Sequence, residues 1–170
     1  MRRYLPIAHR TALLLGAGAE ADDVVQEAFV KAYRGLAGFR VGAPFRPWLL
    51  RIVANETKNL HRSAARRRTR ESAPVDPTDL FPKLSTAADP ADQVVGSEHA
   101  VLRAELLRLP VNHRSVLICR YLLDLDEAET AAVLGIAPGT VKSRGHRALS
   151  RLRRNLDLAA QTSTEGVPRR

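Results

Sequence analysis

The sequence contains few of the residues that form disulfides, metal sites or catalytic centres. Its single cysteine, Cys119, excludes an intramolecular disulfide and is typical of a reducing compartment. Cys119 shares a helical face with Val116 and Leu123, which predicts a core residue. The histidines have no metal-ligand spacing, and no glycine-rich phosphate loop or nucleophile motif occurs. They are His9, His61, His99, His113 and His146. We therefore predict no enzymatic activity, no metal and no cofactor.

Aromatic residues and long apolar runs are also scarce. Aromatics make up 5% of the chain although 45% of it is apolar, so the cores must be aliphatic. The start Met1–Arg3, followed by apolar residues, imitates a secretion signal, but His9 and Arg10 interrupt the apolar stretch. No stretch approaches the roughly 20 apolar residues that span a bilayer. We expect an amphipathic helix here, in a cytoplasmic protein without membrane insertion.

Positive charge is abundant, and it is unevenly distributed. Residues 1–70 carry 14 basic and 5 acidic side chains, residues 71–98 carry 1 and 6, and residues 99–170 carry 12 and 7. The net charges of these segments are therefore +9, −5 and +5. Two basic blocks joined by an acidic segment predict two modules that each bind a polyanion. Charge alone leaves DNA, RNA and membrane open, and a GC-rich genome would also raise the arginine count.

The apolar periodicity predicts an all-α fold of two small helical domains joined by a flexible linker. Expected helices span about 4–15, 22–36 with Asp22 as N-cap, 47–68, 97–109, 112–123, 126–135 and 138–156. The expected units are a first domain at 1–70, an acidic proline-containing linker at 71–96, a second domain at 97–157 and a disordered tail at 158–170. The linker prediction depends on four prolines among Asp, Ser and Thr, namely Pro74, Pro77, Pro82 and Pro90.

Segment 126–152 has the layout of a helix-turn-helix. Asp126 begins a capping-box-like sequence, Gly135 ends the first helix, and Pro138 opens the second. The apolar face of the second helix carries Val141, Gly145, Ala148, Leu149 and Leu152. The opposite face carries Thr140, Ser143, Arg144, Arg147 and Arg151. Hydroxyl and guanidinium groups bind phosphates and base edges. The alternative is a solvated basic face on an ordinary helical hairpin.

Residues 109–152 resemble region four of the extracytoplasmic-function sigma factors. The resemblance depends on Leu109-Pro110, Arg114, Val116-Leu117, Arg120-Tyr121, Glu129-Thr130-Ala131, Leu134-Gly135, Gly139-Thr140-Val141-Lys142-Ser143-Arg144, Arg147-Ala148 and Leu152-Arg153. It implies contact with the polymerase flap and recognition of the minus-thirty-five element in the major groove. The implied DNA-binding residues are Thr140, Lys142, Ser143, Arg144, Arg147 and Arg151. Two departures are Ala137, in place of a capping serine, and Gly145, in place of a large apolar residue. A mid-helix glycine costs about 1 kcal/mol relative to alanine, so we expect a loose helix.

Asp22, Asp23, Gln26 and Glu27 form an acidic patch within the basic first block. Such a patch suits an arginine-rich protein partner and repels DNA. The helix macrodipole, which favours acids at a helix start, is the alternative explanation for Asp22 and Asp23. Segment 22–33 is similar to region two of the same family, which holds the polymerase clamp helices. The resemblance implies that these four residues bind polymerase.

Segment 45–55 resembles the promoter-melting and minus-ten recognition segment of the same family. One helical face carries Arg51, Asn55, Lys58, Asn59 and Arg62, opposite Trp48, Ile52 and Leu60. By the resemblance these five polar residues bind minus-ten DNA, and Asn55 with the loop at about 38–46 holds a flipped base. Asn59 departs from an aspartate frequent in the family, so promoter preference does not carry over. We expect Trp48 in the core rather than stacked on a base.

The resemblance covers about 22–68 and 97–156 and implies a sigma factor that binds core RNA polymerase and directs promoter recognition, DNA melting and transcription initiation. The implied partners are core polymerase and promoter DNA. Such proteins are often held inactive by an anti-sigma factor, which no residue of this sequence identifies. The closest alternative is a stand-alone helix-turn-helix transcriptional regulator. That alternative explains segment 126–152 but leaves the acidic helix and segment 45–62 without a role.

Overall fold

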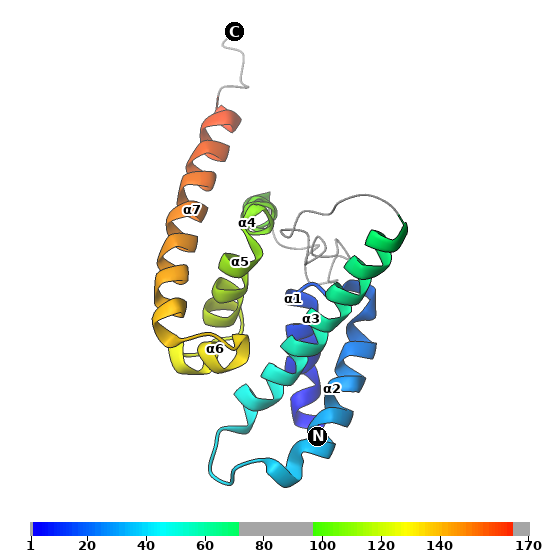
Figure 1. Cartoon of the computed structure of the whole chain (residues 1–170). Coiled ribbons are helices and arrows are strands. Elements are labelled where there is room, and N and C mark those ends of the chain that lie inside the picture. Colours follow the sequence, from blue (N-terminus) through cyan, green and yellow to red (C-terminus); the bar gives the residue numbers. More distant parts are fainter. Residues whose placement is uncertain (1, 72–96, 165–170) are drawn as a thin grey trace.

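The computed structural model describes residues 2–71 and 97–164, and all regular elements in those ranges are helices (Figure 1). In chain order the α-helices are α1 (Leu5–Leu14), α2 (Ala21–Gly35), α3 (Phe45–Glu71), α4 (Ser97–Arg108), α5 (Val111–Leu117), α6 (Glu127–Leu134) and α7 (Pro138–Thr164). Helices α1–α3 form one group and α4–α7 a second group beside it (Figure 1). The expected all-α fold with two helical regions is confirmed.

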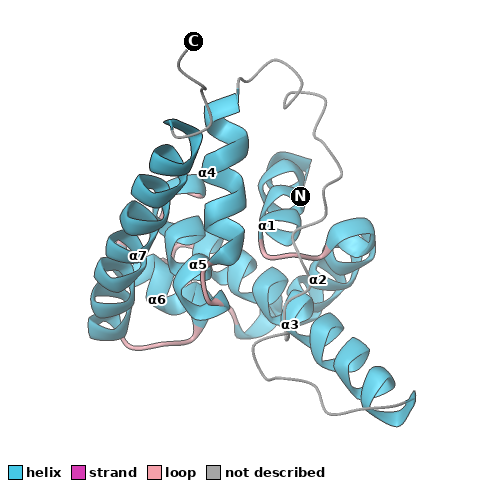
Figure 2. Ribbon diagram, turned by 90° about the horizontal axis from the view of Figure 1, so that it is seen from above, coloured by secondary structure: helices cyan, strands magenta, loops and turns pink. Residues whose placement is uncertain are grey.

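The first group is a three-helix unit in which α1, α2 and α3 contact one another (Figure 2). Its core consists mainly of small side chains. Ala8, Ala12, Ala28 and Val53 are fully buried, and Val25 is 4% exposed. Small side chains allow close approach of helix axes, which fall 8–10 Å apart depending on the residues at the contact. The helices therefore form one compact unit whose outer faces are left for other partners.

The start of α2 differs from the expected position. The helix begins at Ala21, the N-cap position is Glu20, and no side chain caps it. Asp22 therefore lies inside the first turn, and the prediction that it is the N-cap is wrong. The short 3-10 helix Gly18–Glu20 leads directly into α2, so the chain is already turning before it reaches Asp22.

The second group is built around α7, which contacts α4, α5 and α6. Leu109, Leu117 and Ala148 form one buried cluster there. Arg114 on α5 is buried as well, and its Nη1 donates a hydrogen bond to the carbonyl of Leu107 (2.9 Å). Desolvation lowers the pKa of this guanidinium. The bond joins α5 to the C-terminal turn of α4.

The helix expected at 112–123 is divided into two segments. Helix α5 ends at Leu117 and continues as the π-helical segment η6 (Ile118–Leu122). The wider turn is closed by backbone bonds from Leu123 N–H to the Ile118 carbonyl (2.9 Å) and from Leu125 N–H to the Cys119 carbonyl (3.0 Å). Cys119 is fully buried, and burial raises its thiol pKa to about 12. The prediction of a core cysteine is thus confirmed.

Helix α7 is longer than predicted from the sequence. It ends at Thr164 rather than near Leu156, because residues 157–164 contain neither glycine nor proline to stop it. The described part of the predicted tail is therefore helical, and its last six residues, like the linker at 72–96, lie outside the described residues. Within the described ranges, no helix combines the length and the apolarity that a membrane crossing requires.

The two groups contact each other where α3 packs against α6. Leu15 and Leu50 from the first group share a buried cluster with Ile118, Leu125 and Val133 from the second group. A guanidinium nitrogen of Arg46 also donates a hydrogen bond to the carbonyl of Leu123. This contact determines how the outer faces of α3 and α7 are oriented relative to each other.

Candidate nucleic-acid and protein interfaces

The helix-turn-helix is fixed by local capping interactions at α6. Asp126 Oδ1 accepts a hydrogen bond from the backbone N–H of Glu129 (2.7 Å), while Asp126 N–H donates to Glu129 Oε2 (3.0 Å). Gly135 ends the helix with φ +66°, a left-handed conformation that glycine adopts without strain. Pro138 then occupies the first turn of α7. The capping box, the glycine turn and the proline start are all confirmed.

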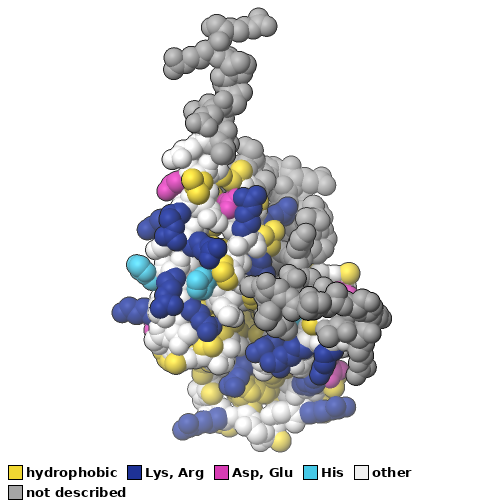
Figure 3. Space-filling model, turned by 45° about the horizontal axis from the view of Figure 1, so that its top comes forward, with side chains coloured by type: hydrophobic (Ala, Val, Ile, Leu, Met, Phe, Trp, Pro, Cys, Tyr) yellow, Lys and Arg dark blue, Asp and Glu magenta, His cyan; other side chains and the backbone are white. Residues whose placement is uncertain are grey.

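Helix α7 separates an apolar face from a basic one. Val141 and Ala148 are buried against α5. The predicted DNA-binding residues lie on the outer side, where Lys142, Ser143, Arg147 and Arg151 are exposed and Thr140 and Arg144 are half-buried. Figure 3 shows that Lys and Arg side chains predominate on this side of the molecule and that acidic side chains are few. The arrangement can present hydroxyl and guanidinium donors to a polyanion.

His113 on α5 belongs to the same electrostatic environment, which its position in the sequence does not indicate. Burial, and then the positive charges of Arg151, Arg144 and Arg147, hold its pKa below the usual value of 6.5. Its Nδ1 is buried without a hydrogen-bond partner. Because His113 and the three arginines come from different helices, helical spacing could not bring them together. Burial is the larger cause of the lowered pKa, and the three arginines of α7 add to it.

The polar face predicted on α3 is exposed. Arg51, Asn55, Lys58, Asn59 and Arg62 all reach solvent on that helix. Asn59 Nδ2 donates a weak hydrogen bond to Glu56 Oε1 (3.4 Å). Thr57 and His61 are buried on the other side, where Thr57 Oγ1 donates to the Val53 carbonyl (3.0 Å). The division into a polar outer face and a packed inner face is therefore present.

Aromatic side chains anchor the loop that precedes α3. The Phe39 ring lies 4.8 Å from Trp48 and 5.6 Å from Phe45, and Tyr4 lies 5.0 Å from Phe45. Trp48 is half-buried in this group. It is thus a packing residue, as expected, although it is not fully enclosed. Four of the eight aromatic residues of the chain gather here, which fixes the loop at 38–46 against the first turn of α3.

The acidic patch on α2 is exposed. Asp22, Asp23, Gln26 and Glu27 all lie on the solvent side, and Asp22 keeps 92% of its side-chain surface accessible. Two of them lie beside a basic side chain, since Asp22 Oδ1 lies 3.2 Å from His9 Nε2 and Glu27 Oε1 lies 3.4 Å from Lys31 Nζ. The patch can therefore meet a partner without rearrangement of the core.

Lys31 also joins α2 to α3. Its Nζ lies 2.5 Å from Glu56 Oε2, and this hydrogen bond is the main reason why the pKa of Lys31 is raised. The Glu56 side chain is only 12% exposed, so the pair fixes the outer face of α3 relative to that of α2. The acidic face of α2 and the polar face of α3 therefore keep a fixed position relative to each other.

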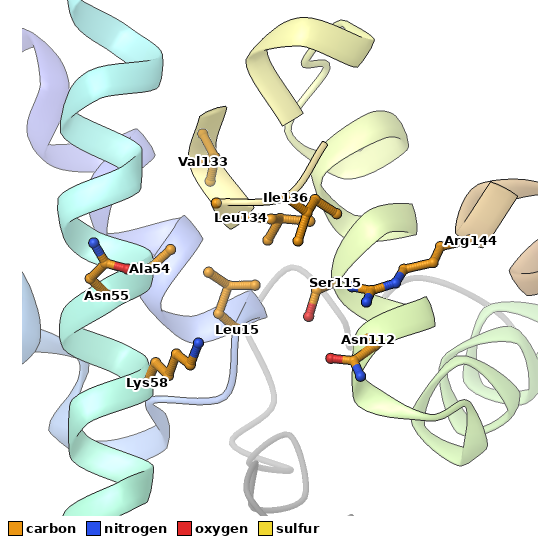
Figure 4. Close-up of a pocket in the computed structure, with 11 residues that line it drawn as sticks. Leu15, Ala54, Asn55, Lys58, Asn112, Ser115, Val133, Leu134, Ile136 and Arg144 are labelled. Atoms are coloured by element: carbon orange, nitrogen blue, oxygen red, sulfur yellow. The ribbon is translucent and has the colours of Figure 1, made fainter. Parts of the chain in front are cut away.

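A cleft of about 280 Å³ lies between the two helical groups. Asn55 and Lys58 of α3 line one side, and Asn112, Ser115 and Arg144 line the other (Figure 4). Lys58 extends from α3 into this space, and Arg144 reaches toward it from α7 (Figure 4). The structure thus brings members of both predicted DNA-binding sets to one opening. Among the described residues, no group of three or more His, Cys, Asp or Glu side chains is placed to hold a metal ion.

Two family models match the two helical groups. Sigma-70 region 2 matches residues 1–67, and Sigma-70 region 4 matches residues 99–152. The first match includes the acidic helix and the α3 face, which a stand-alone helix-turn-helix regulator would not need. That alternative is therefore not favoured.

Similar proteins extend the resemblance over most of the chain. The ECF RNA polymerase sigma factor SigM of Mycobacterium tuberculosis is 40% identical over 91% of this chain and 74% of its own length. SigW of Bacillus subtilis is 33% identical over 84% of this chain and 79% of its own length. The sigma factor RpoE of Bartonella quintana, solved in complex with the anti-sigma factor NepR, superposes with a TM-score of 0.72 at 27% identity and covers 90% of this chain and 91% of that chain. The paired regions, their order and these relatives together show that the chain belongs to the extracytoplasmic-function RNA polymerase sigma factors.

Proposed function

We propose that this sigma factor divides its work among three surfaces. The acidic face of α2 binds core polymerase, the polar face of α3 binds the minus-ten element, and the basic face of α7 binds the minus-thirty-five element. The observation that carries this division is the opposite charge of two exposed faces on one three-helix unit. Asp23 and Glu27 lie on one face, and Arg51 and Lys58 lie on the other. DNA favours the basic face, while the acidic face suits a basic protein.

The minus-ten assignment is supported by the chemistry of α3. Amide side chains such as Asn55 can bond a base edge, and the neighbouring cations can hold the phosphate backbone. Opening a promoter extrudes a base from the stack at a cost of a few kcal/mol, and a receiving pocket offsets that cost. The aromatic-anchored loop at the start of α3 precedes Asn55 in the chain, and we propose that it contributes to such a pocket.

The remaining parts of the assignment follow from the family. We propose that the chain catalyses no reaction itself and acts in the cytoplasm, where polymerase and chromosomal DNA are found. The proposed domains are 1–70 and 97–157 with 71–96 as a linker, and the last helix of each continues past its boundary, α3 to Glu71 and α7 to Thr164. RpoE of Bartonella quintana was solved with an anti-sigma factor, and we propose a partner of that kind for this chain as well.

Transcription with added core polymerase tests the division of labour, using three variants with matched controls. Arg147→Ala should weaken binding to a minus-thirty-five duplex by about 1–3 kcal/mol if the lost contact is to a base. Arg153→Ala, an exposed arginine of the same helix outside the proposed set, should not. Fluorescence anisotropy of a labelled duplex measures both affinities. Equal affinities for the two variants would remove α7 from the DNA interface.

The other two surfaces are tested in the same assay. Asn55→Ala should leave duplex binding intact but reduce permanganate reactivity of melted thymines, whereas Ser63→Ala, also exposed on α3, should not. Reversing the charges of Asp23 and Glu27 to Lys should reduce polymerase binding, whereas Glu20→Lys should have a smaller effect. Absence of an open complex at every promoter of the protein's own genome would contradict the function as a whole.

A further inference from the structure

The cleft lined by α3, α5 and α7 has no role in the function proposed above. Its volume of about 280 Å³ lies just below the range of about 300–1,000 Å³ that is typical of small-molecule pockets. A DNA duplex, whose major groove alone is about 12 Å wide, does not fit into a space of this size. A ligand of this cleft is therefore a small molecule.

The charged side chains of the cleft are all positive. Lys58 extends into the space from α3, and Arg144 reaches toward it from α7 (Figure 4). No Asp or Glu is among the described residues that line it. A cleft lined by one sign of charge focuses the electric field and concentrates ions of the opposite sign. The cleft therefore favours an anionic ligand.

These two cations have no counter-ion in the free chain. No other described residue forms an ion pair or a hydrogen bond with the Lys58 ammonium or the Arg144 guanidinium. Arg144 is half-buried, and a charge that loses water without gaining a partner costs free energy. Arg114 and Arg120, which are also withdrawn from solvent, instead donate to backbone carbonyls at 2.9 Å and 2.6 Å. An anion bound in the cleft would offset the cost at Arg144.

Another part of the cleft lining is apolar. Leu15 and Ala54 come from the first helical group, and Val133, Leu134 and Ile136 come from the second. Covering apolar surface is favourable, because it removes that surface from water. Inorganic phosphate would leave these side chains uncovered, whereas a ligand with a compact organic part would cover them. The lining thus suits a molecule that joins an anionic group to an organic body.

Ser115 adds a directional requirement. Its Oγ donates a hydrogen bond to the Val111 carbonyl (2.9 Å). The hydroxyl hydrogen is therefore in use, and the oxygen, which lies at the cleft (Figure 4), can only accept. Phosphate oxygens are acceptors themselves, so Ser115 pairs better with a hydroxyl or amino group on the organic body. A sugar hydroxyl meets this requirement.

We propose that this cleft binds a small phosphate ester of the sugar phosphate or nucleoside monophosphate class. Lys58 and Arg144 supply the positive charge that holds the phosphate, and Ser115 accepts a hydrogen bond from a hydroxyl of the organic body. Arginine can bond two phosphate oxygens in parallel, and lysine adds a compact charge. One consequence rests on the function proposed above, in which Lys58 and Arg144 bind promoter DNA. A bound ester would then compete with DNA for both residues.

Isothermal titration calorimetry of the full-length chain tests the site, with AMP and ribose 5-phosphate as probes. Both esters should bind more tightly than inorganic phosphate, which lacks the organic body. AMP should also bind more tightly than adenosine, which lacks the phosphate. These two comparisons separate the contribution of the charge from that of the apolar lining.

Charge removal identifies the two cations. Lys58→Gln and Arg144→Gln should each weaken binding of both esters about tenfold or more, because each loses a hydrogen bond between charged groups. Arg66→Gln on α3 and Arg153→Gln on α7 are matched controls, since both arginines are exposed and lie outside the cleft lining. The controls should bind the esters as wild type does.

Two further variants keep both cations and change the rest of the cleft. Ala54→Phe fills the space beside the half-buried Ala54 and should abolish the preference for the esters over inorganic phosphate. Ser115→Ala removes the acceptor and should weaken the esters but not inorganic phosphate. This second variant keeps the test valid if Ala54→Phe fails to fold. In NMR spectra of the wild-type chain, AMP should shift the methyl signals of Leu15, Val133 and Ile136.

Three results would overturn the site. They are no heat of binding with either ester at millimolar concentration, equal affinities for the esters and inorganic phosphate, and equal ester affinities in Arg144→Gln and Arg153→Gln. A failure of the proposed function is distinguishable through competition, measured by fluorescence anisotropy of a labelled promoter duplex with and without AMP. If AMP binds the chain but leaves duplex affinity unchanged, the ester site stands and the assignment of Lys58 and Arg144 to DNA fails.

Discussion

The two helical groups fill their cores with different side chains. In the first group the fully buried positions include Ala8, Ala12 and Ala28. In the second group they are mostly branched aliphatics, such as Val116 and Ile118. Small side chains let α2 and α3 pack closely. The acidic face of α2 and the basic face of α3 therefore lie on the same three-helix unit. In the second group, larger side chains pack against the apolar face of α7. Its opposite, basic face is therefore the one that remains exposed.

The largest expected effect comes from shortening a large core residue in the second group. Leu117 is 4% exposed between Leu109 and Ala148. Leu117→Ala should lower the free energy of unfolding by about 2–5 kcal/mol, because lost burial and the remaining cavity both destabilise the fold. Leu122→Ala, at a position that is 37% exposed, should have a much smaller effect. Urea unfolding followed by circular dichroism measures both, and similar losses would mean that the second group does not depend on close packing.

The first group should respond to the opposite change. Ala28 is fully buried among the small residues of its cluster. Ala28→Leu should destabilise the fold by about 1–3 kcal/mol because the added methylenes force neighbouring side chains and helices apart. Ala19→Leu, at an exposed position, is the control. A stable Ala28→Leu variant with unchanged polymerase binding would contradict the close approach of the helices.

Local features of the fold could be predicted from the sequence, and contacts between distant segments could not. The capping box at Asp126 and the turn at Gly135 depend on neighbouring residues, and both were predicted correctly. The exposed faces of α3 and α7 followed from helical spacing for the same reason. The Arg46 bond to the Leu123 carbonyl joins residues 77 positions apart, which no periodicity indicates. The π-helical turn after Leu117 likewise depends on backbone hydrogen bonds between residues five positions apart, which the composition of the segment does not predict.

A smaller effect is expected from the glycine inside α7. We expected Gly145 to loosen this helix, and a Cβ added there would lie 3.6 Å from Val116 Cγ1, an ordinary contact distance. Gly145→Ala should therefore stabilise the second group by up to about 1 kcal/mol through helix propensity. Gly145→Leu should lose this gain, because the larger side chain would meet Val116. Thermal unfolding of both variants separates the two contributions, and equal stabilities would mean that the site is less confined than the structure indicates.

The smallest effect concerns the charge environments of the two groups. In the first group His9 lies 3.2 Å from the Asp22 carboxylate. In the second, burial and three arginines of α7 hold the pKa of His113 below 6.5. The folded state therefore favours the neutral ring of His113, and the unfolded chain takes up its proton first as the pH falls. His113 thus leaves the fold fully stable above about pH 6.5 and destabilises it progressively from there down to its folded-state pKa.

His113→Gln should remove this part of the pH dependence and leave the part due to carboxylates. The urea midpoints of wild type and variant, compared at about pH 7.5 and about pH 5.5, should therefore diverge in the acid range. The variant should lose less stability there. An identical decline in both proteins would show that burial and the arginines of α7 together do not lower the pKa of His113. DNA phosphates at those arginines would offset part of their charge, so duplex binding should raise the pKa of His113. An NMR titration of its ring protons with and without duplex measures that change and links the electrostatics of α5 to DNA binding by α7.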